Sequence, residues 1–234
     1  MVIRIEDLGR YVGKAVIDTY GRNIGRLIGL ATNARDEVVS VALELANGEL
    51  LQCASSQILM KGDSLVFTPS WRIEAIQLQK EFELATRRVR ALDELNKSGE
   101  LQGEIYMSLK KQHESVVEEV KGRRQGLISN LEERLTGLNG QIRDLQTLLA
   151  NNKMLHTSRE IEDSAYQMAS EAIRSSLERT QAEKKDIEEV VDHLSKLETL
   201  MDLSYQPPTP SPASAPLGPK EPRDVIVVHV KEKV

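Results

Sequence analysis

Apolar residues recur at spacings of three and four along the stretch from Trp71 to Leu203, and this pattern restricts the possible fold more than any other feature of the chain. Its clearest runs are Leu78, Phe82, Ala85, Val89 and Leu92, then Leu131, Leu138, Ile142, Leu145 and Leu149, and finally Ile187, Val191, Leu194, Leu197 and Met201. This spacing is typical of a coiled-coil seam. Because so narrow an apolar stripe needs a partner helix, we predict a coiled coil over residues 70–203.

We expect the coiled coil in two helical pieces with a break near residues 151–157. Asn151 and Asn152 interrupt the pattern there, and Thr157 or Ser158, followed by acidic residues, could cap a second helix. The first piece also contains Gly99, Gly103, Gly122, Gly126, Gly137 and Gly140. Each glycine costs about 1 kcal/mol relative to alanine in a helix interior, so these residues predict weak joints or close helix approach. The pieces could pair within one chain or between molecules, and their unequal lengths predict homo-oligomers in either case.

Residues 1–69 differ in composition, with Val, Ile, Leu and Gly in runs of four to eight residues separated by turn signals. The runs predict strands over residues 14–18, 24–32, 37–45, 49–53 and 64–68, with a short piece near residue 58. Five or six short strands favour closure into a barrel, because closure removes exposed strand edges. With only eight aromatic residues in 234, the chain does not build one large globular core.

The first predicted hairpin consists of Gly13-Lys14-Ala15-Val16-Ile17-Asp18 followed by Gly21-Arg22-Asn23-Ile24-Gly25-Arg26-Leu27. A strand of this kind, an aspartate, a glycine-bearing turn and Ile-Gly at the next strand resemble the start of a PRC-barrel domain. The resemblance implies a docking module without a reaction of its own. These glycines also suit ordinary turns and bulges, and their spacing does not match the G-x-G-x-x-G loop of dinucleotide-binding proteins.

The chain ends in a proline-rich linker, residues 204–223, and a strongly β-forming segment, residues 224–234. The linker is expected to be extended and disordered. The terminal segment contains Val225-Ile226-Val227-Val228-His229-Val230. It could return to its own barrel as a further strand or add a strand to another protein, and the long linker favours an external partner.

Charge and chemistry argue against several functional classes. The formal net charge is −5, so DNA or an anionic membrane would need a local basic patch. Candidate contacts for such an anion are Arg87, Arg88, Arg90, Lys121, Arg123 and Arg124, although nearby glutamates favour an ordinary solvated helix surface. The four histidines lack metal-ligand spacing, and Cys53 lies in a predicted strand as a small buried residue. We therefore expect no enzyme activity, metal or cofactor, and, without an evident signal peptide or membrane span, a cytoplasmic protein.

The order of these parts resembles the archaeal CdvA family of cell division proteins over the whole chain. The resemblance implies an α+β protein in several parts: a PRC-type β-barrel, long coiled-coil helices, and a disordered tail with a terminal strand peptide. It further implies a cytoskeletal scaffold that polymerises at the division site, peripheral at the membrane, and sometimes assembles with DNA. The implied partner is CdvB, an ESCRT-III-like protein whose winged-helix domain would contact Val225, Ile226, Val227, Val228 and Val230. The alternatives are a DNA- or chromosome-associated coiled-coil protein and an adaptor for RNA processing.

Overall fold

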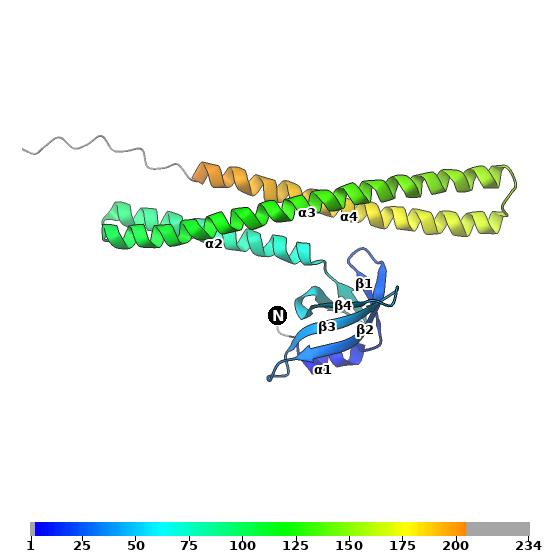
Figure 1. The fold of residues 1–234 in the computed structure, drawn as a ribbon, viewed down its shortest axis with the longest axis horizontal. Helices are drawn as coiled ribbons and strands as arrows, with labels where there is room; N and C mark the ends of the chain where they lie inside the picture. Colours follow the sequence, from blue (N-terminus) through cyan, green and yellow to red (C-terminus); the bar gives the residue numbers. More distant parts are fainter. Residues whose placement is uncertain (1–2, 205–234) are drawn as a thin grey trace, which may run out of the picture.

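The structure, a computed structural model, describes residues 3–204, which form a small sheet module beside an elongated set of helices (Figure 1). The module begins with the short helix α1 (Ile5–Leu8) and the 3-10 turn η1 (Gly9–Tyr11). The helical part consists of α2 (Ser70–Ser98), α3 (Gly103–Thr157) and α4 (Asp163–Ser204). The linker beyond Ser204 and the terminal segment, including Val225–Val230, lie outside the described residues.

Six strands form one sheet in the order β4-β3-β2-β1-β6-β5. They are β1 (Ala15–Asp18), β2 (Asn23–Thr32), β3 (Val38–Leu45), β4 (Leu50–Ala54), β5 (Ile58–Lys61) and β6 (Ser64–Phe67). β1 and β6 are parallel, and the other pairs are antiparallel. The module core includes Leu8 and Tyr11, whose side chains from α1 and η1 are 0% and 1% exposed. The sequence patterns did not identify this N-terminal helical contribution to the core.

The expected barrel is not closed. β4 and β5 are the two ends of the strand order and do not pair with each other. They are joined by the 3-10 turn η2 (Ser55–Gln57), where Gln57 Oε1 accepts a hydrogen bond from the Ala54 N–H. The Gln57 carbonyl accepts a second bond from the Thr68 N–H. These bonds direct the chain out of β4 and set β5 beside β6, so no hairpin joins β4 to β5.

Gly25 explains the Ile-Gly pair at the start of β2. A Cβ at this position would lie 2.0 Å from the carbonyl oxygen of Glu44, so β2 and β3 approach each other too closely for any other residue. The chain continues as a long β2–β3 antiparallel pair with two register shifts, between Leu27 and Gly29 and between Ala31 and Thr32. Such irregularities bend and twist strands, which curves this part of the sheet.

The helical part has three helices where the sequence predicted two pieces. One break, at residues 99–102, was not predicted. There Gly99 takes a φ of 77°, and its N–H donates hydrogen bonds to the carbonyl oxygens of Leu95 and Asn96. Such a left-handed glycine is a common way to end a helix. The second break lies at residues 158–162 instead of 151–157, because α3 continues through both asparagines to Thr157. At this turn Arg159 takes a φ of 64°, and His156 stacks on Tyr166 of α4.

The other glycines of α3 neither interrupt the helix nor allow close packing within this chain. The helix runs unbroken through Gly122, Gly126, Gly137 and Gly140. A Cβ added at any of these four would meet no atom within 4 Å. Close helix approach, one of the two roles predicted for them, is therefore not observed at these four glycines within the described chain.

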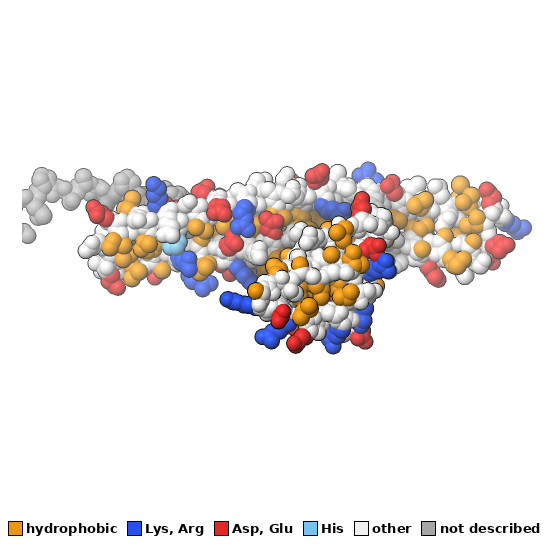
Figure 2. Space-filling view, turned by 60° about the horizontal axis from the view of Figure 1, so that its bottom comes forward, with side chains coloured by type: hydrophobic (Ala, Val, Ile, Leu, Met, Phe, Trp, Pro, Cys, Tyr) orange, Lys and Arg blue, Asp and Glu red, His pale blue; other side chains and the backbone are white. Residues whose placement is uncertain are grey.

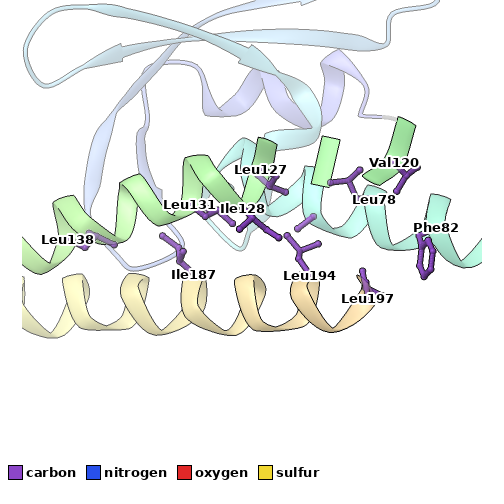
Figure 3. Packing of buried hydrophobic residues seen from close by; sticks show 11 residues of the cluster. Leu78, Phe82, Val120, Leu127, Ile128, Leu131, Leu138, Ile187, Leu194 and Leu197 are labelled. Atoms are coloured by element: carbon purple, nitrogen blue, oxygen red, sulfur yellow. The ribbon is translucent and has the colours of Figure 1, made fainter. Parts of the chain in front are cut away.

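The helices overlap in a staggered arrangement, and α3 contributes to the packing along its length (Figure 1). α2 pairs with the first part of α3, and α4 pairs with the later part and passes beside α2 near the centre. There the buried side chains of all three helices meet (Figure 3): Ala75, Leu78, Phe82, Val120, Leu127, Ile128, Leu131, Leu138, Ile187, Leu194 and Leu197. Within residues 3–204 the seams therefore pair inside one chain, and three helices pack together only in the central section.

Candidate functional site

The turn between β1 and β2 fixes the sheet module to the helices. Asp18 Oδ1 accepts hydrogen bonds from the N–H groups of Tyr20 (2.9 Å) and Arg22 (2.8 Å). Gly21 takes the φ of 80° that this turn requires. The aspartate and glycine that the sequence resemblance singled out thus shape a rigid turn. That turn presents Tyr20 and Arg22 to α4.

We call the contact between the β1–β2 turn and the helices the joint. Its central interaction is an ion pair between Arg22 and Glu183 of α4. Arg22 Nη2 lies 2.5 Å from Glu183 Oε2 and also donates to the carbonyl oxygen of Arg179 at 3.2 Å. The other carboxylate oxygen of Glu183 lies 2.7 Å from Nη2 of Arg134 on α3. The Glu183 side chain is only 7% exposed. Each oxygen of this buried carboxylate therefore has its own guanidinium, which offsets part of the cost of removing the charge from water.

A second cluster at the joint centres on Asp186, one turn further along α4. Its Oδ2 accepts a hydrogen bond from the Tyr20 hydroxyl at 2.9 Å and lies 2.9 Å from Nη1 of Arg72 on α2. Burial, followed by the hydrogen bond to Asp186, raises the pKa of Tyr20 above its ordinary value. Tyr20 is therefore a stable proton donor to this carboxylate. Together the two clusters connect the module to all three long helices.

Beyond the central section, the helices form two arms with two helices each. We call residues 83–119 the α2–α3 arm and residues 139–182 the α3–α4 arm. Hydrophobic side chains reach the surface near both ends of the helical part (Figure 2). On the α2–α3 arm the exposed large apolar residues are Leu84, Leu95, Ile105, Met107 and Val116. On the α3–α4 arm they are Leu148, Met154 and Met168, of which Met168 is 69% exposed.

The α2–α3 arm also contains an open groove of about 400 Å³ next to the central section. Its apolar lining comes from Phe82, Val89 and Val117, and charged residues such as Arg90 and Lys121 line its sides. Phe82 belongs to the buried cluster of the central section. The groove is thus continuous with the core that α4 covers further along.

Residues 70–214, which comprise the helical part and the start of the tail, match the CdvA-like coiled-coil domain. The chain belongs to the CdvA-like coiled-coil family. It is also similar to the protein named Cell division protein A from Sulfolobus acidocaldarius, with 27% identity over 199 residues. The similarity covers 85% of this chain and 83% of that protein.

The six candidate anion-binding residues all lie within the CdvA-like region, but their surroundings differ. Lys121 forms an ion pair with Glu118 at 2.8 Å, and Arg123 forms one with Glu81 at 2.7 Å. Arg124 is 3% exposed and donates to the carbonyl oxygen of Leu194. Its guanidinium stabilises the helical core and is not available to a phosphate in this structure.

The other three candidates lie together on the α2–α3 arm. Arg87, Arg88 and Arg90 are exposed. No hydrogen bond or ion pair joins any of them to another residue of the described part. The structure therefore separates a solvent-facing arginine cluster from three basic residues that have partners within the chain.

Three further observations concern metal ligands, the single cysteine and membrane spans. Among the side chains of residues 3–197, no group of three or more His, Cys, Asp and Glu is placed to hold a metal ion. Cys53 is 8% exposed, and burial raises the pKa of its thiol, which lowers its reactivity. In the same range no helix is long and apolar enough to cross a membrane.

Sequence reasoning missed the joint, although one signal was present. Glu183 lies four residues before Ile187, at a position where the seam of α4 would have an apolar side chain. Arg124 similarly occupies a seam position between Val120 and Leu127. A charged residue at a seam position needs a buried partner of opposite charge or a hydrogen-bond acceptor. That partner could not be identified before the module and the helices were placed together.

Proposed function

We propose that this chain is a non-enzymatic, self-assembling scaffold of archaeal cell division. In this proposal its arms join copies into filaments, and its terminal segment recruits the ESCRT-III-like protein CdvB to the membrane at the division site. Membership of the CdvA-like family and similarity to a protein named Cell division protein A support the cell-division role. The described residues support a structural role, because their polar clusters connect the module to the helices.

The staggered arrangement of the helices is the observation that carries the self-assembly proposal. Each two-helix arm keeps large apolar residues at its surface, and an apolar helix face is normally buried against another element. The α2–α3 arm contains residues 83–98 of α2 and is therefore about 24 Å long at about 1.5 Å per residue. The α3–α4 arm contains residues 139–157 of α3 and is about 28 Å long. Arms of such similar length can pair side by side as a four-helix bundle. Pairing of unlike arms is a head-to-tail contact, which extends into a filament unless it closes into a ring.

Complementary arm variants test this assembly. Met107→Glu and Met168→Glu each place a charge on one arm at a side chain that is already 64% or 69% exposed, so the chain should still fold. We expect each variant alone to form no filaments in electron microscopy and to sediment as single, unassembled chains. Mixed in equal amounts, they should form a discrete pair, because the mixture retains one intact contact between unlike arms. Val39→Glu, at a 54% exposed site on the sheet, is the control that should still form filaments.

Two results would contradict the head-to-tail arrangement. Filaments that survive both arm variants would show that the arms are not the contact. Discrete dimers formed by each variant alone would indicate that like arms contact like arms, because each variant keeps one intact arm.

The recruitment proposal rests on the sequence of the terminal segment. Val225–Val230 would add to the partner's winged-helix domain as a strand, with backbone hydrogen bonds for affinity and alternate side chains for selectivity. Removal of residues 221–234 should abolish binding to that domain in calorimetry and leave filaments unchanged. Val227→Glu should have the same effect with a single substitution. If truncation removes binding to duplex DNA but leaves partner binding intact, the recruitment proposal is wrong.

DNA binding is the second candidate function, and the exposed arginine cluster favours it. Arg87, Arg88 and Arg90 can reach phosphates without breaking an ion pair of the described chain. Replacing all three with Gln should weaken duplex DNA binding and reduce its salt dependence. The control replaces two basic residues that already have acidic partners, Lys121 and Arg123, and its loss of DNA affinity per charge removed should be much smaller. Equal losses in both variants would show that this cluster has no special role.

A further inference from the structure

The edge strand β4 has backbone groups without a partner strand in the described chain. The Leu45 N–H donates to the Glu49 carbonyl at 2.8 Å, which sets the hydrogen-bonding phase of the β3–β4 hairpin. Because hydrogen-bonded and non-hydrogen-bonded pairs alternate along an antiparallel ladder, the pairs Leu43–Leu51 and Val41–Cys53 exchange these bonds. The N–H and carbonyl groups of Leu50 and Gln52 therefore point away from β3, toward the open edge.

This edge lacks three of the features that commonly block strand addition, namely proline, charged side chains and a β-bulge. β4 reads Leu50-Leu51-Gln52-Cys53-Ala54 and contains no proline and no charged residue, and its register with β3 is unshifted. Leu50 is 65% exposed, the most exposed large apolar side chain of the module. An exposed apolar edge of this kind invites pairing with another strand. β4 is also one of the two end strands, β4 and β5, that would have to pair for the sheet to close into a barrel.

We propose that Val225–Val230 of the same chain adds to β4 as an antiparallel strand. The 20 residues between Ser204 and Val225 can span up to about 60 Å at about 3.1 Å per residue. The module contacts α4 at Glu183, which is about 32 Å of helix before Ser204 at about 1.5 Å per residue. The linker is therefore long enough to return along α4 to the module. The six-residue run also matches the five residues of β4.

Charge favours the antiparallel direction. The terminal run is followed by Lys231 and Lys233 and preceded by Asp224. Glu49 immediately precedes β4. An antiparallel strand places the lysines beside Glu49, whereas a parallel strand would bring Asp224 to that end. Like charges on neighbouring strands are unfavourable and opposite charges are favourable.

This contact would regulate recruitment, and in that respect it rests on the proposed function. A strand bound to β4 has one of its two hydrogen-bonding edges occupied, so a partner that needs the same edge competes with β4 for the segment. A flexible tether gives the segment an effective concentration of about 1 mM at the edge, so even weak intrinsic affinity keeps it bound. A partner must then bind tightly enough to displace it.

Amide hydrogen exchange of the full chain tests the contact directly. We expect the amides of Leu50 and Gln52 to exchange at least tenfold faster in Val227→Pro than in the unchanged chain, because proline interrupts the added strand. The amide of Val41, in the interior of the sheet, is the internal control and should not change. Unaltered exchange at Leu50 and Gln52 would overturn the proposal. A change confined to β5, or protection that depends on chain concentration, would also overturn it.

A substitution on the other side of the contact separates this inference from the recruitment proposal. Gln52→Pro removes an N–H that points to the open edge, where proline is tolerated, so the sheet should remain folded. We expect it to release the tail, seen as faster exchange of the Val225–Val230 amides, and to strengthen binding of an ESCRT-III-like winged-helix domain at least threefold. Unchanged tail exchange overturns the strand contact. Released tail amides without any partner binding, in either chain, overturn recruitment but leave the contact intact.

Discussion

Arg22 of the β1–β2 turn and Glu183 of α4 lie 161 positions apart in the chain, and their side chains form an ion pair. Glu183 is also paired with Arg134, so a single buried carboxylate connects the sheet module to two helices. The covalent connection between the module and α2 is only Thr68 and Pro69. This ion pair, together with the Tyr20–Asp186 bond, therefore sets the angle between the module and the helices.

Glu183→Gln should loosen this joint. The substitution keeps the shape of the side chain but leaves Arg22 and Arg134 without their shared charge. Both arginines are partly exposed and can recover some hydration, so we expect a loss of about 1–2 kcal/mol in the free energy of unfolding. Urea denaturation measures this loss, and small-angle scattering should show a wider range of module positions. Glu189→Gln, which affects an exposed pair with Lys185 on the same helix, should change stability by less than about 0.5 kcal/mol.

The central three-helix section should dominate the stability of the helical part. Leu194 is 0% exposed and packs among side chains of α2 and α3. Leu194→Ala should lower the free energy of unfolding by about 2–5 kcal/mol, because it removes buried methyl groups and leaves a cavity. Leu148→Ala, at a 52% exposed position of the α3–α4 arm, should cost less than about 1 kcal/mol in the same measurement. Equal losses at the two positions would show that stability is spread evenly along the helices.

Gly126→Ala tests why α3 tolerates glycines. No atom lies within 4 Å of a Cβ at this position, so alanine should fit and should raise the free energy of unfolding by about 0.5–1 kcal/mol. A more stable chain that still forms filaments would show that this glycine serves no contact. A more stable chain that no longer assembles would indicate that a second copy packs closely against this face of α3.

Alkaline pH should weaken the joint through Tyr20. Burial and the bond to Asp186 raise the pKa of Tyr20, so the folded state holds this proton more tightly than the unfolded state. Its contribution to stability is complete below the ordinary tyrosine pKa of about 10 and is lost as the pH rises through the folded value. Urea denaturation between pH 8 and 11 should therefore show a steeper fall for the unchanged chain than for Tyr20→Phe. Parallel curves would contradict this role of Tyr20.

The regular parts of the fold were accessible from the sequence because they depend on local periodicity. The three-and-four spacing predicted the long helices, and the turn signals between short apolar runs predicted the hairpins of the module. The number of helices was harder to predict. A single glycine in the left-handed conformation ended α2 at residue 99, whereas the four later glycines and the asparagines at 151 and 152 lie inside α3. Glycine permits a break without requiring one, and packing against neighbouring helices decides which glycines are used.

By itself, the sequence determined the order of a β module, long amphipathic helices and a proline-rich tail, because residue type and spacing set local backbone preferences. It also indicated the family to which the chain belongs. Only the tertiary structure decided that the seams pair within one chain, that Arg124 is buried while Arg87 is exposed, and that Arg22 meets Glu183. The same heptad spacing suits pairing within or between chains, and the same basic residue suits a core or a surface. Those choices depend on which elements meet in space, and the sequence pattern of one element does not contain that information.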